Sequence, residues 1–164
     1  FDGDLAYQPS LYPLSEWMRQ ADALDAKRVV VVMDSCFSGK GDRSVVRTDA
    51  RLLTLVPEGG VLEKAATKKL IYVGATTGDA PSFKHPEKPG GLFTYFWTKG
   101  MEGAADSSGD GLITVGELFR YTEEQVVAIT RRFPDAGEQH PTLYPKDSNL
   151  AETVLVRIRK NEKK

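Results

Sequence analysis

Two short apolar runs stand out in the pattern of hydrophobic and polar positions along the chain. Residues 29–33 contain four consecutive valines and a methionine, and a second run covers 70–75. Short, β-branched runs of this kind are typical of strands buried on both faces of a parallel sheet, and we assign that environment to 29–33. A helix predicted around 61–68 separates the runs, so we expect a crossover connection and a parallel strand pair.

Helical spacing of apolar residues predicts three further helices. In the first, Ser15 is the expected N-cap, the helix ends near Ala26, and the apolar positions are Leu14, Trp17, Met18, Ala21 and Leu24. An aromatic-rich buried helix is expected over 92–101. Another is expected over 115–132, with a basic last turn that suits its dipole and Pro134 to stop it.

The remaining segments complete an α/β pattern. Residues 40–51 lack a clear period and predict an exposed loop, and the tail over 138–150 is rich in turn residues. Residues 153–158 predict a final strand, and the lysine-rich end is expected to fray.

Composition narrows the class of protein. The 164 residues, 40% of them hydrophobic, are enough for one globular domain over 1–164. The 22 basic and 23 acidic residues nearly cancel, so the charge balance recommends neither nucleic acid nor a membrane surface as partner. We see no apolar run near the length of a membrane span and no secretory leader in these residues. A single cysteine fits a reducing compartment, and we expect a cytoplasmic location.

The single cysteine, Cys36, follows the valine run by a few residues. A lone cysteine cannot form an internal disulfide, which leaves a packing role, a metal role or a role as a nucleophile. In open α/β sheets, ligands bind at the carboxyl ends of the strands. The position of Cys36 at such an end therefore favours chemistry.

The run Asp34-Ser35-Cys36-Phe37-Ser38-Gly39 resembles the nucleophile segment of caspase-like cysteine peptidases, in particular the metacaspase and bacterial caspase-like branch. The resemblance continues in family order through 69–77, 91–96 and 111–118, and so covers nearly the whole chain. It implies a caspase-like three-layer sandwich, with a mostly parallel central sheet and helices on both faces. It also suggests a bacterial defence or stress setting.

The resemblance implies a cysteine endopeptidase in which Cys36 is the nucleophile and forms an acyl-enzyme with a protein or peptide substrate. The family's histidine, in a His-Gly pair, lies roughly 50 residues before the cysteine. Only 35 residues precede Cys36, so we expect that histidine and the first strands in an upstream segment or chain. His85 and His140 do not match the family position. The alternative is a domain that has lost the histidine and serves as an inactive binding or regulatory module.

Asp34 has two interpretations: an aspartate that caps or turns the chain at the strand end, or a carboxylate in the S1 pocket. The resemblance implies the second, and hence cleavage after arginine or lysine. Asp79 is a secondary candidate for the same pocket. In the family, the loop that contains Thr76 and Thr77 borders the substrate cleft. Cleavage after basic residues makes the loop with Arg43, Arg47 and Arg51 a candidate for self-processing.

Residues 106–117 partly match a calcium-binding loop. The matching ligand positions are Asp106, Ser108, Asp110, Leu112 (through its carbonyl) and Glu117, with a turn glycine at Gly111. Against calcium, the loop holds only three carboxylates and has no partner loop, and similar Gly-Asp-Gly sequences serve as tight turns in caspase-like proteins. Calcium binding, and with it a calcium-sensor function, stays an alternative, and the peptidase itself requires no cofactor.

Overall fold

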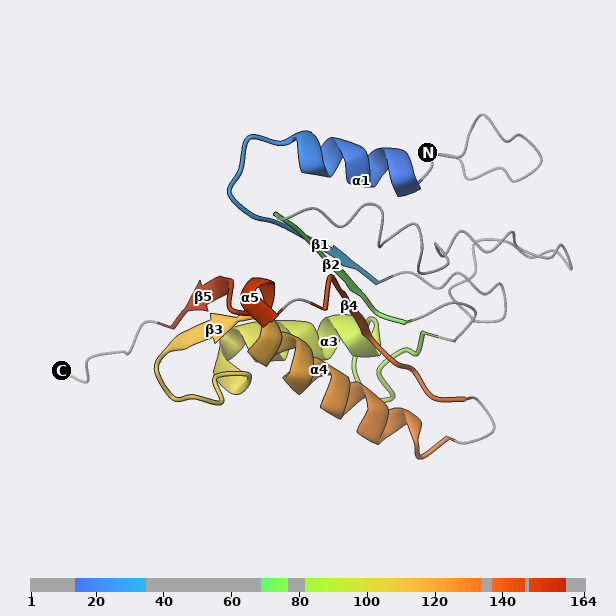
Figure 1. The fold of residues 1–164 in the computed structure, drawn as a ribbon. Coiled ribbons are helices and arrows are strands. Elements are labelled where there is room, and N and C mark those ends of the chain that lie inside the picture. Colours follow the sequence, from blue (N-terminus) through green and yellow to red (C-terminus); the bar gives the residue numbers. More distant parts are fainter. Residues whose placement is uncertain (1–13, 35–68, 77–81, 134–136, 147, 159–164) are drawn as a thin grey trace, which may run out of the picture.

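The computed structural model describes residues 14–34, 69–76, 82–133, 137–146 and 148–158, and these form a mixed α/β fold with two small sheets (Figure 1). The helices are α1 (Leu14–Ala23), α3 (Leu92–Lys99), α4 (Val115–Thr130) and α5 (Ser148–Ala151), with a π-helical turn, η2 (Gly100–Ala104). The strands are β1 (Val29–Met33), β2 (Leu70–Gly74), β3 (Leu112–Thr114), β4 (Thr142–Tyr144) and β5 (Val154–Arg157).

The larger sheet has the strand order β1-β2-β4. Strands β1 and β2 are parallel, in a register that runs from Val29 opposite Leu70 to Met33 opposite Gly74, which confirms the predicted parallel pair. On its other side β2 pairs with β4 in the antiparallel sense. Strand β4 falls within the tail that was predicted to be rich in turns. It has only three residues and lies between Pro141 and Pro145, so it is too short to show alternation of apolar and polar residues.

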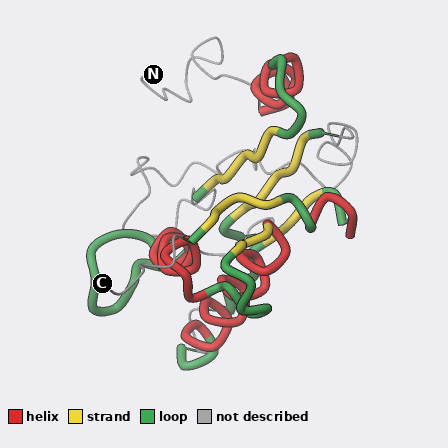
Figure 2. Tube along the Cα trace, turned by 90° about the vertical axis from the view of Figure 1, so that its left-hand side faces the viewer, coloured by secondary structure: helices red, strands yellow, loops and turns green. Residues whose placement is uncertain are grey.

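Helices lie on both faces of the larger sheet. Helix α1 lies over one face, while α3 and α4 lie on the opposite side (Figures 1 and 2). The alternation of side chains along β2 explains the arrangement, because Leu70 and Tyr72 pack with Met18 of α1 whereas Ile71 and Val73 join the core around α3 and α4. Strand β2 is therefore buried along its whole length.

The two predicted apolar strands differ in burial. In the structure only Val31 of β1 is buried, and Val32 is 42% exposed, so the prediction that β1 is buried on both faces is wrong. Within the described part of the chain β1 pairs with β2 alone and forms an edge of the sheet, whereas β2 lies between two strands. An edge strand keeps one long side open to solvent, which the valine pattern alone does not reveal.

Helix α1 covers less of the sheet than its sequence predicted. It begins at Leu14, one residue ahead of the expected cap Ser15, and ends at Ala23 instead of near Ala26. Met18 is buried at 2% exposure, but Trp17 and Leu24 are 41% and 56% exposed, so their expected packing is wrong. Met18 packs in a small cluster with Val31 of β1 and with Leu70 and Tyr72 of β2, and this is the cluster through which α1 meets the sheet.

The predicted helices over 92–101 and 115–132 are confirmed in type. Helix α3 gives way to η2 after Lys99, and Gly100 lies so close to α4 that a Cβ atom there would come within 2.3 Å of Leu118 Cδ1. Helix α4 ends at Thr130, so the expected basic last turn is wrong, because the arginines at 131 and 132 follow the helix.

The predicted final strand is confirmed as β5, although it belongs to the second sheet. There it pairs with β3 in the antiparallel sense, and Ile113 opposes Val156. The sequence analysis did not predict β3, which follows the glycine-rich turn directly and leads straight into α4. The small sheet thus joins the amino-terminal end of α4 to the end of the described chain.

Several expectations fall outside the described residues. They concern the loop at 40–51, the helix at 61–68 and Pro134, together with Cys36, Thr77 and Asp79. Within the described ranges, every helix is too short or too polar to cross a bilayer.

Candidate active site

Asp34 is the last described residue before Cys36 and lies at the carboxyl end of β1. Its Oδ1 accepts a hydrogen bond from Ser82 Oγ at 3.2 Å. Its Oδ2 accepts from the backbone N–H of Thr94 at 3.3 Å and from the Thr94 hydroxyl. The carboxylate thus joins the end of β1 to the segment before α3 and to the first turn of that helix.

The contact with Thr94 completes the amino-terminal end of α3. The N-cap residue of this helix is Gly91, which has no side chain to accept from the free N–H groups of the first turn. Asp34 supplies that acceptor from a distant strand, and a carboxylate at a helix N-terminus is also favoured by the helix dipole. Asp34 is therefore a capping residue, but for a helix far along the chain and not for a local turn at the strand end, while the binding of a basic substrate side chain stays a prediction.

Thr76 shares the same edge of the sheet. The N–H of Ala75 donates to the carbonyl of Met33 at 2.8 Å, so the chain leaves β2 beside the point where it leaves β1. Thr76 is only 7% exposed. Its contact with substrate stays a prediction.

A buried amide that the sequence analysis missed ties this region together. Gln139 has no solvent-exposed surface, and its Nε2 donates to the carbonyl of Ala75 at 2.8 Å. Its Oε1 accepts from the N–H of Phe83 at 2.8 Å. Gln139 lies in a turn-rich stretch without periodicity, so no local signal identifies it. Ser82 and Thr94 were missed as well, because their partner Asp34 lies 48 and 60 positions away.

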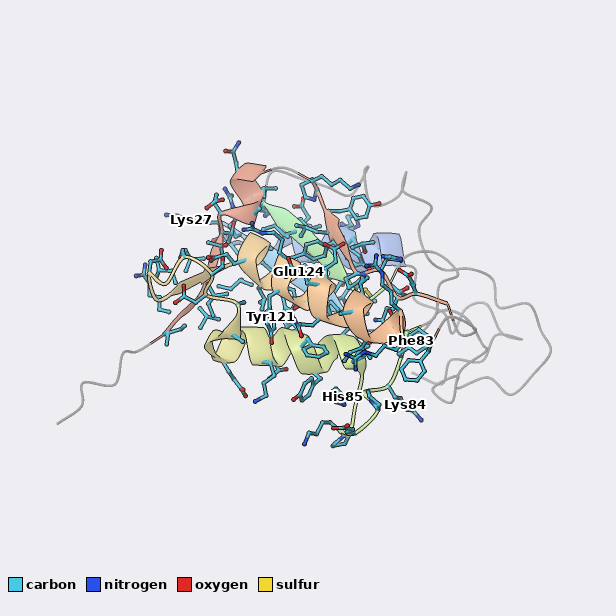
Figure 3. The ribbon with its side chains drawn as sticks, turned by 90° about the horizontal axis from the view of Figure 1, so that it is seen from below. Lys27, Phe83, Lys84, His85, Tyr121 and Glu124 are labelled. Atoms are coloured by element: carbon cyan, nitrogen blue, oxygen red, sulfur yellow. The ribbon has the colours of Figure 1, made fainter. Side chains whose placement is uncertain are left out.

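His85 is poorly suited to act as the base for a thiol. Its Nδ1 accepts hydrogen bonds from the N–H groups of Glu87 at 3.1 Å and Lys88 at 3.0 Å. A neutral imidazole that accepts at Nδ1 carries its proton on Nε2, so this tautomer has no nitrogen left to receive another. The ring also packs on Tyr95, with 4.3 Å between the ring centroids. Figure 3 shows His85 beside Phe83 and Lys84.

His140 has a carboxylate partner. Its Nε2 lies 3.3 Å from Glu138 Oε2, and its side chain is half exposed. Cys36 lies outside the described residues, so a role of His140 as its base stays a prediction.

The carboxylates of the predicted calcium loop bind backbone amides of the loop itself. Asp106 accepts from the N–H groups of Gly109 at 2.8 Å and Gly111 at 3.0 Å, and from Ser108 Oγ at 3.3 Å. Asp110 Oδ1 accepts from the N–H of Leu112 at 2.7 Å. Both glycines adopt positive φ angles, which shapes the tight turn.

Glu117, the expected bidentate ligand, forms a capping box with Thr114 at the start of α4. Its Oε2 accepts from the N–H of Thr114 at 3.1 Å, and its Oε1 accepts from Ser107 Oγ at 3.1 Å. These bonds, above all the one from the backbone of Thr114, lower the pKa of Glu117.

Across the described ranges, no group of three or more His, Cys, Asp or Glu side chains is arranged to hold a metal ion. In this conformation the carboxylates of the loop accept hydrogen bonds from the turn and at the helix cap. Calcium binding stays a prediction.

Comparisons with protein-family models, with curated proteins and with solved structures found no match for this chain.

Proposed function

We propose that this chain is the cysteine-bearing part of a caspase-like cysteine endopeptidase that cleaves proteins after arginine or lysine. The observation that carries the proposal is the placement of Asp34. A carboxylate is held in a fixed orientation at the carboxyl end of a parallel strand, two residues before the only cysteine. Ligands of open α/β sheets bind at this edge, and a fixed carboxylate is a suitable partner for a guanidinium or ammonium group.

In the proposed reaction the Cys36 thiolate attacks the scissile carbonyl, the amine leaves, and water hydrolyses the acyl-enzyme. A histidine outside these 164 residues takes the thiol proton and returns it to the leaving amine. The contacts of His85 support this assignment, since two backbone N–H groups already donate to its Nδ1. We place the enzyme in a reducing compartment such as the cytoplasm, because its single thiol must stay reduced.

The proposed fold is the caspase-like sandwich, with further strands supplied by the upstream segment. The parallel β1-β2 pair with helices on both sides supports it. The 42% exposure of Val32 on an uncharged strand supports an added neighbour, because edge strands normally carry charges or prolines that discourage pairing.

A second candidate function is a caspase-like domain without catalysis that binds other proteins. One observation favours it: both histidines of the chain follow Cys36, whereas the histidine of the resembled family precedes the cysteine. A His-Gly pair in the upstream gene sequence would favour the peptidase, and its absence would favour the binding domain.

The test is turnover of fluorogenic peptides that end in arginine, lysine or aspartate, measured on the full-length precursor. We expect release after arginine and lysine that disappears in Cys36→Ala. Asp34→Asn keeps an acceptor for Thr94 but loses the charge, so we expect it to lower kcat/KM for basic peptides by about 100-fold. Asp25→Asn, at an exposed aspartate, is the matched control. Release only after aspartate would refute the role of Asp34, and no release at all would favour the binding domain.

A further inference from the structure

Gln139 joins three parts of the structure through one buried side chain. Its amide bridges the carbonyl of Ala75, directly after β2, and the N–H of Phe83, which precedes α3. Its backbone N–H donates to Thr130 Oγ1, at the end of α4, at 3.2 Å. Figure 3 shows Phe83 close to this end of α4.

The two residues that the amide bridges lie close together in space although they are eight positions apart in the sequence. Ala75 directly follows β2 and Phe83 directly follows Ser82, so a single amide links the end of β2 to the neighbour of Ser82. A buried amide has a fixed orientation only when both its donor and its acceptor are satisfied, and those of Gln139 are. Phe83 is fixed on its other side too, since its carbonyl accepts from the N–H of Leu92 at 2.8 Å.

The hydrogen bonds lead from Gln139 directly to Asp34. Ser82 directly precedes Phe83 in the chain, and the Ser82 hydroxyl donates a hydrogen bond to Asp34 Oδ1. The other carboxylate oxygen is bonded to Thr94 of α3. The direction of the carboxylate therefore depends on the position of Ser82, which depends in turn on the bond between Phe83 and Gln139.

We propose that Gln139 is a positioning residue that, by linking Phe83 to the end of β2, orients Ser82 and Asp34 for the recognition of an arginine side chain. The inference rests on the proposed cleavage after basic residues. An arginine pairs with a carboxylate through two parallel hydrogen bonds, which require a particular carboxylate plane, whereas a lysine binds as a compact charge. A misdirected Asp34 therefore weakens the preference for arginine over lysine more than it weakens cleavage in general.

The test compares kcat/KM for arginine and lysine peptides in variants of the full-length precursor. Gln139→Met removes both amide bonds, and we expect the arginine-to-lysine ratio to fall by about tenfold. Ser82→Ala, in a half-buried position, should produce the same fall with the fold intact. Thr122→Val is the matched control. It removes a fully buried hydroxyl that donates only to the carbonyl of Leu118 in its own helix, so the ratio should not change.

Gln139→Glu separates the two halves of the amide. A charged glutamate still accepts from Phe83 but repels the carbonyl of Ala75, whereas a protonated one donates to it. For Gln139→Glu we expect a low arginine-to-lysine ratio of kcat/KM at neutral pH. The ratio should partly recover in mild acid, when each value is compared with that of the wild type at the same pH. If the Gln139→Met variant does not fold, the arginine-to-lysine ratio of the Gln139→Glu variant is compared with that of the wild type instead.

A structural readout is independent of turnover. The amide resonance of Thr94 reports the position of Asp34, to which it is bonded. It should shift in both the Gln139→Met and Ser82→Ala variants and stay in place in Thr122→Val. In an active enzyme, an unchanged ratio or an unmoved Thr94 amide in the Gln139 variant overturns the inference and leaves the proposed function standing. If the wild type cleaves after neither basic residue, the proposed function fails, and the Thr94 amide alone decides whether Gln139 positions Asp34.

Discussion

The two faces of the larger sheet are packed to very different depths. On the side of α3 and α4, thirteen buried residues of the described chain form one continuous core, which includes Phe93, Ile113 and Leu118, none of them exposed. On the side of α1, four buried residues form the core, with Met18 as the helix's contribution. The main hydrophobic core therefore lies on the side of α3 and α4, whereas α1 is attached to the sheet through a small hydrophobic contact.

The candidate site lies where these two sides meet. Asp34 comes from the thinly packed strand β1, but its hydrogen-bond partners, Ser82 and Thr94, belong to the thickly packed side. Gln139 is buried within that side as well. The Asp34 carboxylate is therefore oriented by residues on the side of α3 and α4, although Asp34 itself directly follows β1.

The largest expected effect is in the larger core. Phe93→Ala removes a fully buried ring that stacks on Trp97, with 5.6 Å between the centroids. We expect a loss of about 4 kcal/mol in the free energy of unfolding, because truncation of a buried aromatic leaves a cavity. Urea unfolding followed by Trp97 fluorescence in a Trp17→Phe background measures it. Phe133→Ala, at a 49% exposed position, is the control, and equal losses in the two variants would contradict the comparison.

Met18→Ala should have a smaller effect and a local one. We expect a loss of about 2 kcal/mol, at the low end for a buried methionine, because only the α1 contact is weakened. Hydrogen exchange should show faster exchange in α1 with little change in α4. Leu24→Ala, 56% exposed, is the control. Equally accelerated exchange in both helices would show that the two sides of the sheet unfold as one unit.

Glu117→Gln tests the polar side of the larger core. The folded-state pKa of Glu117 lies below its usual value of 4.5, mainly because of the hydrogen bond from the backbone of Thr114. This stabilisation is therefore complete above pH 4.5 and is lost as the pH falls through the folded-state pKa. We expect the variant to lose about 1 kcal/mol at neutral pH, typical of a helix cap, and to show a weaker decline in acid.

Thermal unfolding from pH 7 down to pH 3 measures this effect. Glu124→Gln, an exposed position on the same helix, should keep the acid decline of the wild type. A Glu117→Gln variant with an unchanged acid decline would refute the role of the capping box.

The smallest effect is expected at Glu16 on α1. Its hydrogen bond with Arg19 lowers its pKa to about 2, and the two charged groups lie 2.6 Å apart. The Arg19 side chain is 68% exposed and the Glu16 side chain 36%, so solvent and salt screen the pair. We expect Glu16→Gln to leave the melting temperature at neutral pH unchanged within error, in low and in high salt. A decrease as large as that of Glu117→Gln would show that the Glu16–Arg19 pair is not screened by solvent.

The elements with strong periodicity were predictable from the sequence, and their environments were less so. β1, β2, α3 and α4 were expected close to their observed positions, because continuous apolar runs and an apolar period of 3.6 are local signals. The three-residue strands β3 and β4 carry no such period. The exposure of Val32 and Trp17 depends on which elements lie beside them, which a local pattern does not contain.

The candidate site shows the same division. The position of Asp34 at the end of a parallel strand followed from the valine run, since a strand and its end are local features. Its partners Ser82 and Thr94 come from segments far along the chain, and the buried Gln139 comes from farther still. Only the fold brings these polar groups together, so no motif in the sequence identifies them.

The cap that Asp34 provides for α3 links ligand affinity to helix stability. A basic ligand that draws the carboxylate away from Thr94 leaves the first turn of α3 without that acceptor, at a cost of about 1 kcal/mol. That amount corresponds to an affinity about fivefold weaker than an unengaged carboxylate would give. A ligand that binds without breaking the contact between Asp34 and Thr94 does not incur this loss of affinity. Under the proposed function, basic ligands therefore compete with the Thr94 backbone for the Asp34 carboxylate.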